Sequence, residues 1–256
     1  MISSNKIFLV AVLTVEPELI VAGAGAGDPE LITLKAYKLL QEVPVVLYDN
    51  LVNKSLLDYT KPGCENIYVG KLPYGDYTPQ EQIHELIKEK AFSKGRVLRL
   101  KGGDPFIFGR GFEEILFARQ HGIKTTFIPG ITSMQASGLY DIPLTFRNIS
   151  ESIWVVTGTK KDGSLSADLQ LAIQSKATVV IYMGMKKLPE IASIYIDKGY
   201  GDMPAAIIHY ASTPQHKLVR SAIKDLPQLA LEQHITHPAL IIIGPVTNAD
   251  LLAGTE

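Results

Sequence analysis

Two glycine-rich segments stand where short apolar runs end, and they are the first candidates for binding chemistry. One apolar run, Leu19–Ala22, leads into Gly23-Ala-Gly-Ala-Gly-Asp28, and another, starting at Val97, leads into Lys101-Gly-Gly-Asp-Pro-Phe-Ile-Phe-Gly-Arg110. Glycine lets the backbone approach a ligand closely or adopt a positive φ. Open α/β sheets bind ligands at the carboxyl ends of their strands. Both segments are therefore typical of a small-molecule site, in which Asp104 adds a hydrogen-bond acceptor.

The first glycine segment fits the common phosphate-binding patterns poorly. A P-loop has Gly-Lys-Ser/Thr after its glycines, and Asp28-Pro29 stands there instead. A dinucleotide site has Gly-x-Gly-x-x-Gly with an acidic residue about 20 residues further on. Asp49 has a suitable place for that acid, but the spacing here is Gly-x-Gly-x-Gly. A cofactor site and a purely structural turn both stay open for this segment.

The elements that must position these segments alternate along the chain. Apolar and β-branched runs predict strands, and a helical spacing of apolar residues predicts helices between them. The predicted strands are 19–22, 43–48, 97–100, 125–128, 153–157, 178–183, 205–209 and 240–243, and the predicted helices are 30–41, 78–90, 111–121 and 188–198. Continuously apolar strands followed by helices indicate parallel sheets covered on both faces. We therefore predict two α/β domains, 19–131 and 132–256, after an N-terminal extension over residues 1–18.

Composition and charge exclude several classes of protein. The 25 Lys and Arg residues nearly balance 26 Asp and Glu residues, so no polycationic surface for nucleic acid is expected. The apolar run Ile7–Val15 is far shorter than the ~20 residues of a membrane span. A single cysteine, Cys64, excludes a disulfide framework and is typical of a reducing cytosol. No third ligand accompanies His234 and His237 at a suitable spacing, so we expect no metal site.

Longer strings carry a resemblance to a known family. The segment Gly23–Ala36 resembles the opening motif of the tetrapyrrole (class III) S-adenosylmethionine-dependent methyltransferases. Within that family, further strings are similar to the uroporphyrinogen-III C-methyltransferases. They are Leu-Tyr-Asp-Asn-Leu-Val52, Val-Gly-Lys71, Arg99–Gly111, Pro-Gly-Ile-Thr132, Ile-Pro-Leu-Thr145 and Tyr-Met-Gly184. The match runs in order over residues 19 to 246.

The resemblance implies a fold and a reaction. The fold would be two α/β domains with the active site in the cleft between them, usually in a cytoplasmic homodimer. The reaction would be methyl transfer from S-adenosylmethionine to C2 and C7 of uroporphyrinogen III, giving precorrin-2, the precursor of sirohaem and cobalamin, and S-adenosylhomocysteine. Two alternatives stay open: a methyltransferase acting on a later precorrin, and a non-catalytic binder of a tetrapyrrole or of S-adenosylmethionine.

The resemblance also assigns roles to single residues. The family's proposed general base falls on Asp49 and its proposed general acid on Lys71. Its cofactor-binding positions fall on Ala26, Gly102, Gly103, Asp104, Ile107, Thr132, Ser133, Met183 and Ala211. Uroporphyrinogen III carries many carboxylates and the chain is nearly neutral, so local cationic groups must converge on the cleft. We expect Arg110, Arg147 and Lys101 to bind the substrate, since basic side chains, arginine above all, pair well with carboxylates.

Several residues depart from the usual family pattern, among them Asn148 in place of an aspartate and Phe112 where a second glycine is common. Ala26 stands in place of a proline and Ala211 in place of a glycine, and both are expected to narrow the adenosyl pocket. Leu72 stands in place of an arginine and Phe146 in place of a histidine. These two changes remove polar groups near the expected substrate.

Overall fold

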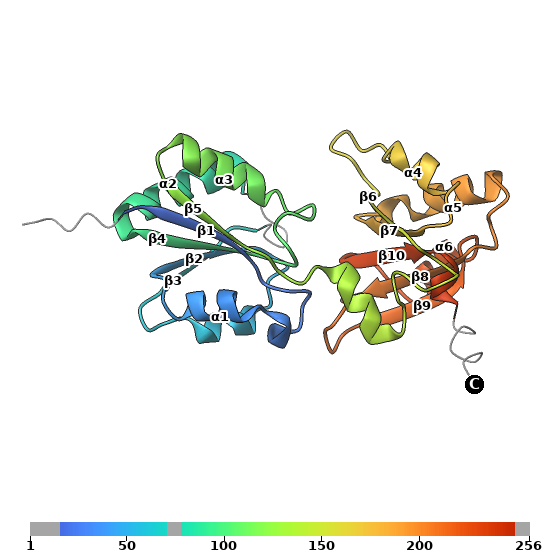
Figure 1. Cartoon of the computed structure of the whole chain (residues 1–256), viewed down its shortest axis with the longest axis horizontal. Helices are drawn as coiled ribbons and strands as arrows, with labels where there is room; N and C mark the ends of the chain where they lie inside the picture. The colour runs from blue at the N-terminus through green and yellow to red at the C-terminus, as the bar shows by residue number, and fades with distance from the viewer. Residues whose placement is uncertain (1–15, 71–77, 249–256) are drawn as a thin grey trace, which may run out of the picture.

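The computed structural model describes residues 16–70 and 78–248, which form two five-stranded sheets lying side by side (Figure 1). A connecting segment between the sheets holds η3 (Ser133–Tyr140), a 3-10 helix. The first sheet contains β1 (Glu18–Gly23), β2 (Val45–Tyr48), β3 (Glu65–Tyr68), β4 (Arg96–Lys101) and β5 (Lys124–Ile128). The second contains β6 (Ile153–Thr157), β7 (Thr178–Tyr182), β8 (Pro204–His209), β9 (Lys217–Ala222) and β10 (Ala239–Ile243).

The first sheet is parallel throughout, as the sequence predicts, in the order β3-β2-β4-β1-β5. Successive side chains of a strand point to opposite faces. On one face Leu19 and Val21 pack under α2 (Gln80–Lys94) and α3 (Gly111–Gln120), and on the other Ile20 and Ala22 pack with α1 (Leu34–Leu40). The helices lie on both sides of the sheet in Figure 1. Since all five strands run the same way, the loops that follow them gather at one edge.

The second sheet is mixed, so the expectation of a parallel sheet is wrong for this half. Its order is β6-β7-β10-β8-β9, and β10 is antiparallel to both β7 and β8. An apolar run predicts that a strand is buried but carries no information about its direction. β9 escaped prediction because its sequence, Lys-Leu-Val-Arg-Ser-Ala, is half polar. β7 and β8 still run in the same direction, because each is antiparallel to β10, and their carboxyl ends share an edge.

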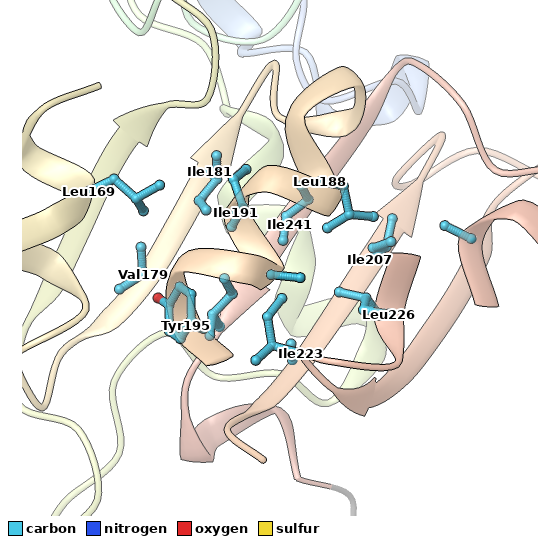
Figure 2. Packing of buried hydrophobic residues seen from close by; sticks show 14 of the residues in the cluster. Leu169, Val179, Ile181, Leu188, Ile191, Tyr195, Ile207, Ile223, Leu226 and Ile241 are labelled. Carbon is cyan, nitrogen blue, oxygen red and sulfur yellow. The ribbon is translucent and has the colours of Figure 1, made fainter. Parts of the chain in front are cut away.

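Two apolar layers cover the second sheet. On one face α4 (Asp168–Ala172), α5 (Leu188–Asp197) and α6 (Leu226–Glu232) pack against the strands, with Ile181, Ile207 and Tyr195 in the cluster (Figure 2). On the other face lie residues of the connecting segment, including Ala136 of η3. Ala26, from the first glycine segment, packs against this second layer. The predicted domain boundary at 131/132 falls just before η3 and stays a prediction.

Local signals explain the other differences from the predicted elements. The helix expected over 30–41 is divided into η1 (Pro29–Leu31) and α1, because the Thr33 side chain caps α1 by accepting a hydrogen bond from Ala36 N. β3, α4 and α6 are short elements that were not predicted, as are η2 (Lys54–Tyr59), η4 (Met185–Lys187) and η5 (Pro245–Thr247). Within residues 16–70 and 78–248, no helix is long and apolar enough to cross a membrane, and no three potential metal ligands cluster.

Candidate active site

The loops after β1, β4 and β5 meet in a tight backbone junction. Ala24 N donates to Lys101 O at 2.7 Å, and Gly103 N donates to Gly25 O at 2.8 Å. A Cβ atom on Gly130 would lie 2.2 Å from Gly103 O, so no side chain fits there. Gly103 itself has a φ of +66°, which costs other residues about 1–2 kcal/mol. These glycines are therefore needed first to let the loops touch, a role that the sequence alone did not separate from ligand binding.

An open hollow of about 350 Å³ lies beside this junction. Its volume falls within the roughly 300–1,000 Å³ of ligand pockets in proteins. Asp104 joins two backbone segments that line the hollow. Its Oδ1 accepts from Phe106 N at 2.7 Å and its Oδ2 accepts from Gly130 N at 3.0 Å. The lining residues are Asp104, Phe106, Ile107, Phe127, Gly130, Thr132, Met134 and Gln135. Three of the predicted cofactor residues, Asp104, Ile107 and Thr132, thus line one hollow with mainly apolar walls.

Tyr182, at the end of β7, joins the second sheet to two residues that line this hollow, Thr132 and Met134. The Tyr182 hydroxyl lies 2.6 Å from Thr132 Oγ1 and accepts from Met134 N at 3.1 Å. Its ring lies 5.2 Å from the ring of Phe108. The next residue, Met183, has a φ of +54° and is exposed. The turn that carries Met183 is thereby held beside the turn that carries Thr132.

A second bridge joins the first glycine segment to the loop after β8. Asp28 N donates to Ser212 Oγ at 3.0 Å. A Cβ atom on Gly27 would lie 2.9 Å from Ala211 O. Ala26 and Ala211 also belong to the same apolar cluster. The two bridges and the junction bring together the loops that carry the predicted cofactor residues, which are Ala26, Gly102, Gly103, Asp104, Ile107, Thr132, Ser133, Met183 and Ala211; their roles stay predictions.

Asp49 lies at the same edge, directly after β2. Its Oδ2 is 3.3 Å from Arg99 Nη2, and its Oδ1 accepts from Leu51 N at 3.2 Å. A Cβ atom on Gly102 would lie 2.4 Å from the Leu51 Cβ atom, so the Asp49 loop packs directly on the glycine pair. The Asp49 side chain is 23% exposed. A carboxylate that is fixed by Arg99 and Leu51 N and is still partly exposed is suited to proton transfer or to stabilising a positive charge.

Lys101 does not face solvent at this edge. Its Nζ lies 3.1 Å from Glu114 Oε1, and the two side chains are 8% and 0% exposed. Burial lowers the pKa of Lys101, and the neighbouring Arg99 charge acts in the same direction, while Glu114 and Asp49 oppose it. A substrate carboxylate would have to displace Glu114 to reach this ammonium group.

The other predicted charged residues differ in how far their charges are already paired. Arg110, the N-cap residue of α3, pairs with Glu113 at 2.5 Å, and this hydrogen bond lowers the pKa of Glu113. Arg147 is exposed and forms no ion pair within the described part of the chain. Phe146 beside it is also exposed. Lys71, the predicted general acid, lies outside the described residues, as does Leu72.

Sequence reasoning did not single out Tyr182, Arg99 or Glu114. Two signals in the sequence could have predicted the ion pair between Arg99 and Glu114. Arg99 and Lys101 are two apart on a strand and so share a face. Glu114 lies on the same side of α3 as the buried residues Ile115 and Ala118. Charges on buried faces of neighbouring elements indicate an internal ion pair.

Comparison with known proteins gives one family match and three similar proteins. Residues 18–227 match the model of the family described as tetrapyrrole (corrin/porphyrin) methylases. The siroheme synthase of Chromobacterium violaceum is 43% identical over 234 residues, covering 90% of this chain and 50% of that protein, so the chain spans about half the length of the curated relatives it matches. The uroporphyrin-III C-methyltransferase of Thermus thermophilus, solved with S-adenosylhomocysteine, is 38% identical with a TM-score of 0.78, covering 90% of this chain and 93% of that one. A cobalt precorrin-4 methyltransferase is 28% identical with a TM-score of 0.80, covering 90% and 96%.

Proposed function

The chain belongs to the tetrapyrrole methylase family, and we propose that it methylates uroporphyrinogen III at C2 and C7 with S-adenosylmethionine as the donor, giving precorrin-2. The observation that carries the proposal is the convergence of a hollow beside Gly103 and a half-buried carboxylate, Asp49, at one edge of the parallel sheet. The uroporphyrin-III C-methyltransferase is the more similar in sequence of the two methyltransferase structures, at 38% against 28% identity. Because the chain spans half of the siroheme synthases, the proposal is confined to methylation.

The hollow suits S-adenosylmethionine in size and chemistry. Phe106, Ile107 and Met134 offer apolar walls for the adenosyl group, while Asp104 and Thr132 offer oxygen acceptors. Gly130 of the tight glycine junction lines the hollow and has no room for a side chain. The residues that would hold the donor are Ala26, Gly102, Gly103, Asp104, Ile107, Thr132, Ser133, Met183 and Ala211. The bound donor supplies a methyl group already activated by its sulfonium charge.

Asp49 would manage charge and the proton. Methylating a pyrrole carbon leaves positive charge on the ring, and a proton must then leave. A carboxylate in place stabilises that charge and accepts the proton. Lys71 is proposed as the matching acid. The loops around the hollow would also align the donor with the ring carbon, and such orientation can be worth effective molarities of ~10⁵–10⁸ M.

Of the three predicted cations, Arg147 has the charge most available to a substrate carboxylate. Its charge is unpaired within the described residues, whereas Arg110 and Lys101 already have acidic partners. Phe146 beside it would add an apolar wall against the macrocycle. We propose in addition that the enzyme is a cytoplasmic homodimer, on the strength of the family resemblance and the single cysteine.

The test is an anaerobic assay with uroporphyrinogen III and methyl-labelled S-adenosylmethionine, with product masses read out. A product carrying two added methyl groups supports the proposal. Ligand-induced stabilisation without methylated product would instead indicate a binder, and turnover of a later precorrin alone would favour the precorrin-4 type of reaction. That second reading is supported by the TM-score of 0.80 to the cobalt precorrin-4 methyltransferase.

The Asp49→Asn variant tests the role of the carboxylate. We expect kcat to fall by ~10²–10⁴-fold, while the affinity for S-adenosylhomocysteine stays unchanged. Asp58→Asn, an exposed aspartate on η2 of the same domain, is the matched control and should keep full activity. An Asp49→Asn enzyme with more than about half the wild-type kcat would contradict the assignment, against that expected fall.

A further inference from the structure

We propose that Glu114 is a positioning residue of the methylation site, which fixes the carboxylate of Asp49 through Arg99. The inference rests on the proposed function, because it takes Asp49 as the group that handles charge and proton. Glu114 lies in the first turn of α3, and Arg99 and Asp49 come from β4 and from the end of β2. Three separate elements of the first sheet and its helix layer therefore meet in one chain of ion pairs.

Glu114 is held rigidly. Its Oε1 accepts from Arg99 Nε at 3.2 Å, from Lys101 Nζ at 3.1 Å and from Gln80 Nε2 at 3.3 Å. Its side chain is 0% exposed, so water does not compete for these donors. Its Oε2 is buried and has no hydrogen-bond partner among the described residues. A buried carboxylate oxygen without a partner costs stability. The arrangement of Glu114 is therefore explained better by its hold on Arg99 and Lys101 than by a gain in stability.

Arg99 transmits this constraint to Asp49. Its Nε donates to Glu114, its Nη1 donates to Leu47 O at 3.3 Å and Leu100 O at 2.9 Å, and its Nη2 donates to Asp49 Oδ2 at 3.3 Å. The guanidinium group is a planar fork, so Nη2 cannot turn away from Asp49 unless the other bonds break. Leu51 N fixes the second carboxylate oxygen. The direction of the Asp49 carboxylate is thus set from beneath the site.

A purely stabilising role explains this arrangement less well. The cluster contains two acids and two bases, and only Asp49 reaches the open edge. Desolvation of buried ions often cancels their mutual attraction, so a buried ion pair is weak evidence for stability. Here the pairs lie directly beneath a proposed catalytic carboxylate and end on it. Orientation of that carboxylate accounts for their location.

Glu114→Gln tests the inference, because the amide keeps the shape and removes the charge that holds Arg99. We expect kcat to fall by about 10²-fold, the loss expected when a catalytic group is displaced by about 1 Å. The KM for uroporphyrinogen III and the Kd for S-adenosylhomocysteine should both stay within about twofold, which marks a loss confined to the transition state. The matched control is Glu18→Gln, which breaks the Glu18–Arg96 pair at the opposite end of β4 and should leave kcat unchanged.

A double variant separates orientation from charge balance. Glu114→Gln with Lys101→Met leaves Arg99 and Asp49 as a balanced pair, so this protein should fold even where the single variant does not. If Glu114 orients Arg99, the double variant keeps a low kcat and binds S-adenosylhomocysteine normally. Recovery of wild-type kcat in the double variant overturns the proposal, as does a single variant whose kcat stays within about twofold. Loss of the fold in both variants also overturns it, because the cluster would then serve stability.

Wild-type turnover tells the two levels of inference apart. A wild-type enzyme that binds S-adenosylhomocysteine but yields no methylated uroporphyrinogen refutes the proposed function, and the role of Glu114 falls with it. An active wild-type enzyme with an unaffected Glu114→Gln variant refutes the role of Glu114 alone.

Discussion

Replacing Tyr182 by phenylalanine should weaken donor binding more than it weakens the fold. The ring and its contact with Phe108 remain, and only the hydroxyl that joins Thr132 Oγ1 and Met134 N is lost. A neutral hydrogen bond contributes about 1 kcal/mol net, so the two bonds together contribute about 1–2 kcal/mol. If all of this free energy serves to keep the Thr132 turn ordered, its loss lowers the affinity for S-adenosylhomocysteine by roughly 5–30-fold.

Isothermal calorimetry with S-adenosylhomocysteine measures this loss. Tyr195→Phe is the matched control, because the Tyr195 hydroxyl is buried between α5 and the second sheet and has no partner among the described residues. Removing an unpaired buried hydroxyl should be neutral or stabilising and leave the affinity unchanged. A Tyr182→Phe protein with wild-type affinity, or an equal loss in both variants, would show that the bridge from β7 does not order the donor site.

Three further outcomes are expected. Gly103→Val should abolish S-adenosylhomocysteine binding, because it places a branched side chain beside Thr132, which lines the hollow, on a backbone whose φ of +66° favours glycine. Gly122→Val, with a similar positive φ and open space around it, should be strained but bind normally in calorimetry. Arg147→Leu should raise the KM for uroporphyrinogen III by roughly 10–100-fold, the value of a charged hydrogen bond, and an unchanged saturation curve would make Arg147 structural. Burial, aided by the Lys217 charge, lowers the pKa of His209. The stability that neutral His209 contributes to the folded state is therefore complete above the ordinary histidine pKa of about 6.5, and it is lost as pH falls through the lowered pKa of the folded state. Thermal unfolding at pH 7 and pH 5 should therefore show a smaller fall in Tm for His209→Leu than for the wild type, and equal falls would contradict this.

The place where the glycine loops meet could be predicted from the sequence, because it depends on features that have a local signature. Glycines directly after apolar strands predict close backbone approach, and parallel strands must end at a common edge. The segments after Gly23 and Lys101 indeed meet, and Asp49 lies beside them. The order of strands and the antiparallel direction of β10 have no such signature, because a buried strand is apolar in either direction.

The pairing of charges was not readable in the same way. Lys101 is the last residue of β4, and a lysine at a strand end is equally compatible with the cleft and with the interior. Its direction follows from the parity it shares with Arg99 on β4 and from the packing of α3 on that face. Only when Glu114 of α3 is placed opposite does the lysine acquire an internal partner. A residue's role here is set by an element about ten positions away in sequence, which no motif within β4 encodes.

The internal ion pairs also suggest that the donor and the substrate carboxylates would be bound by different parts of the molecule. Arg99 and Lys101 are neutralised by Glu114 and Asp49, and Arg110 by Glu113, so the described cations on the predicted edge of the first sheet carry little free charge. Binding of the proposed anionic macrocycle would then draw on cations elsewhere, and Arg147 lies in the segment that connects the two sheets. The first sheet would thus supply the donor hollow and the aimed carboxylate, while the connecting segment would supply a charge for the substrate. Because these cations are paired internally, the open side of Asp49 would be left to stabilise the positive charge that the proposed methylation places on the ring.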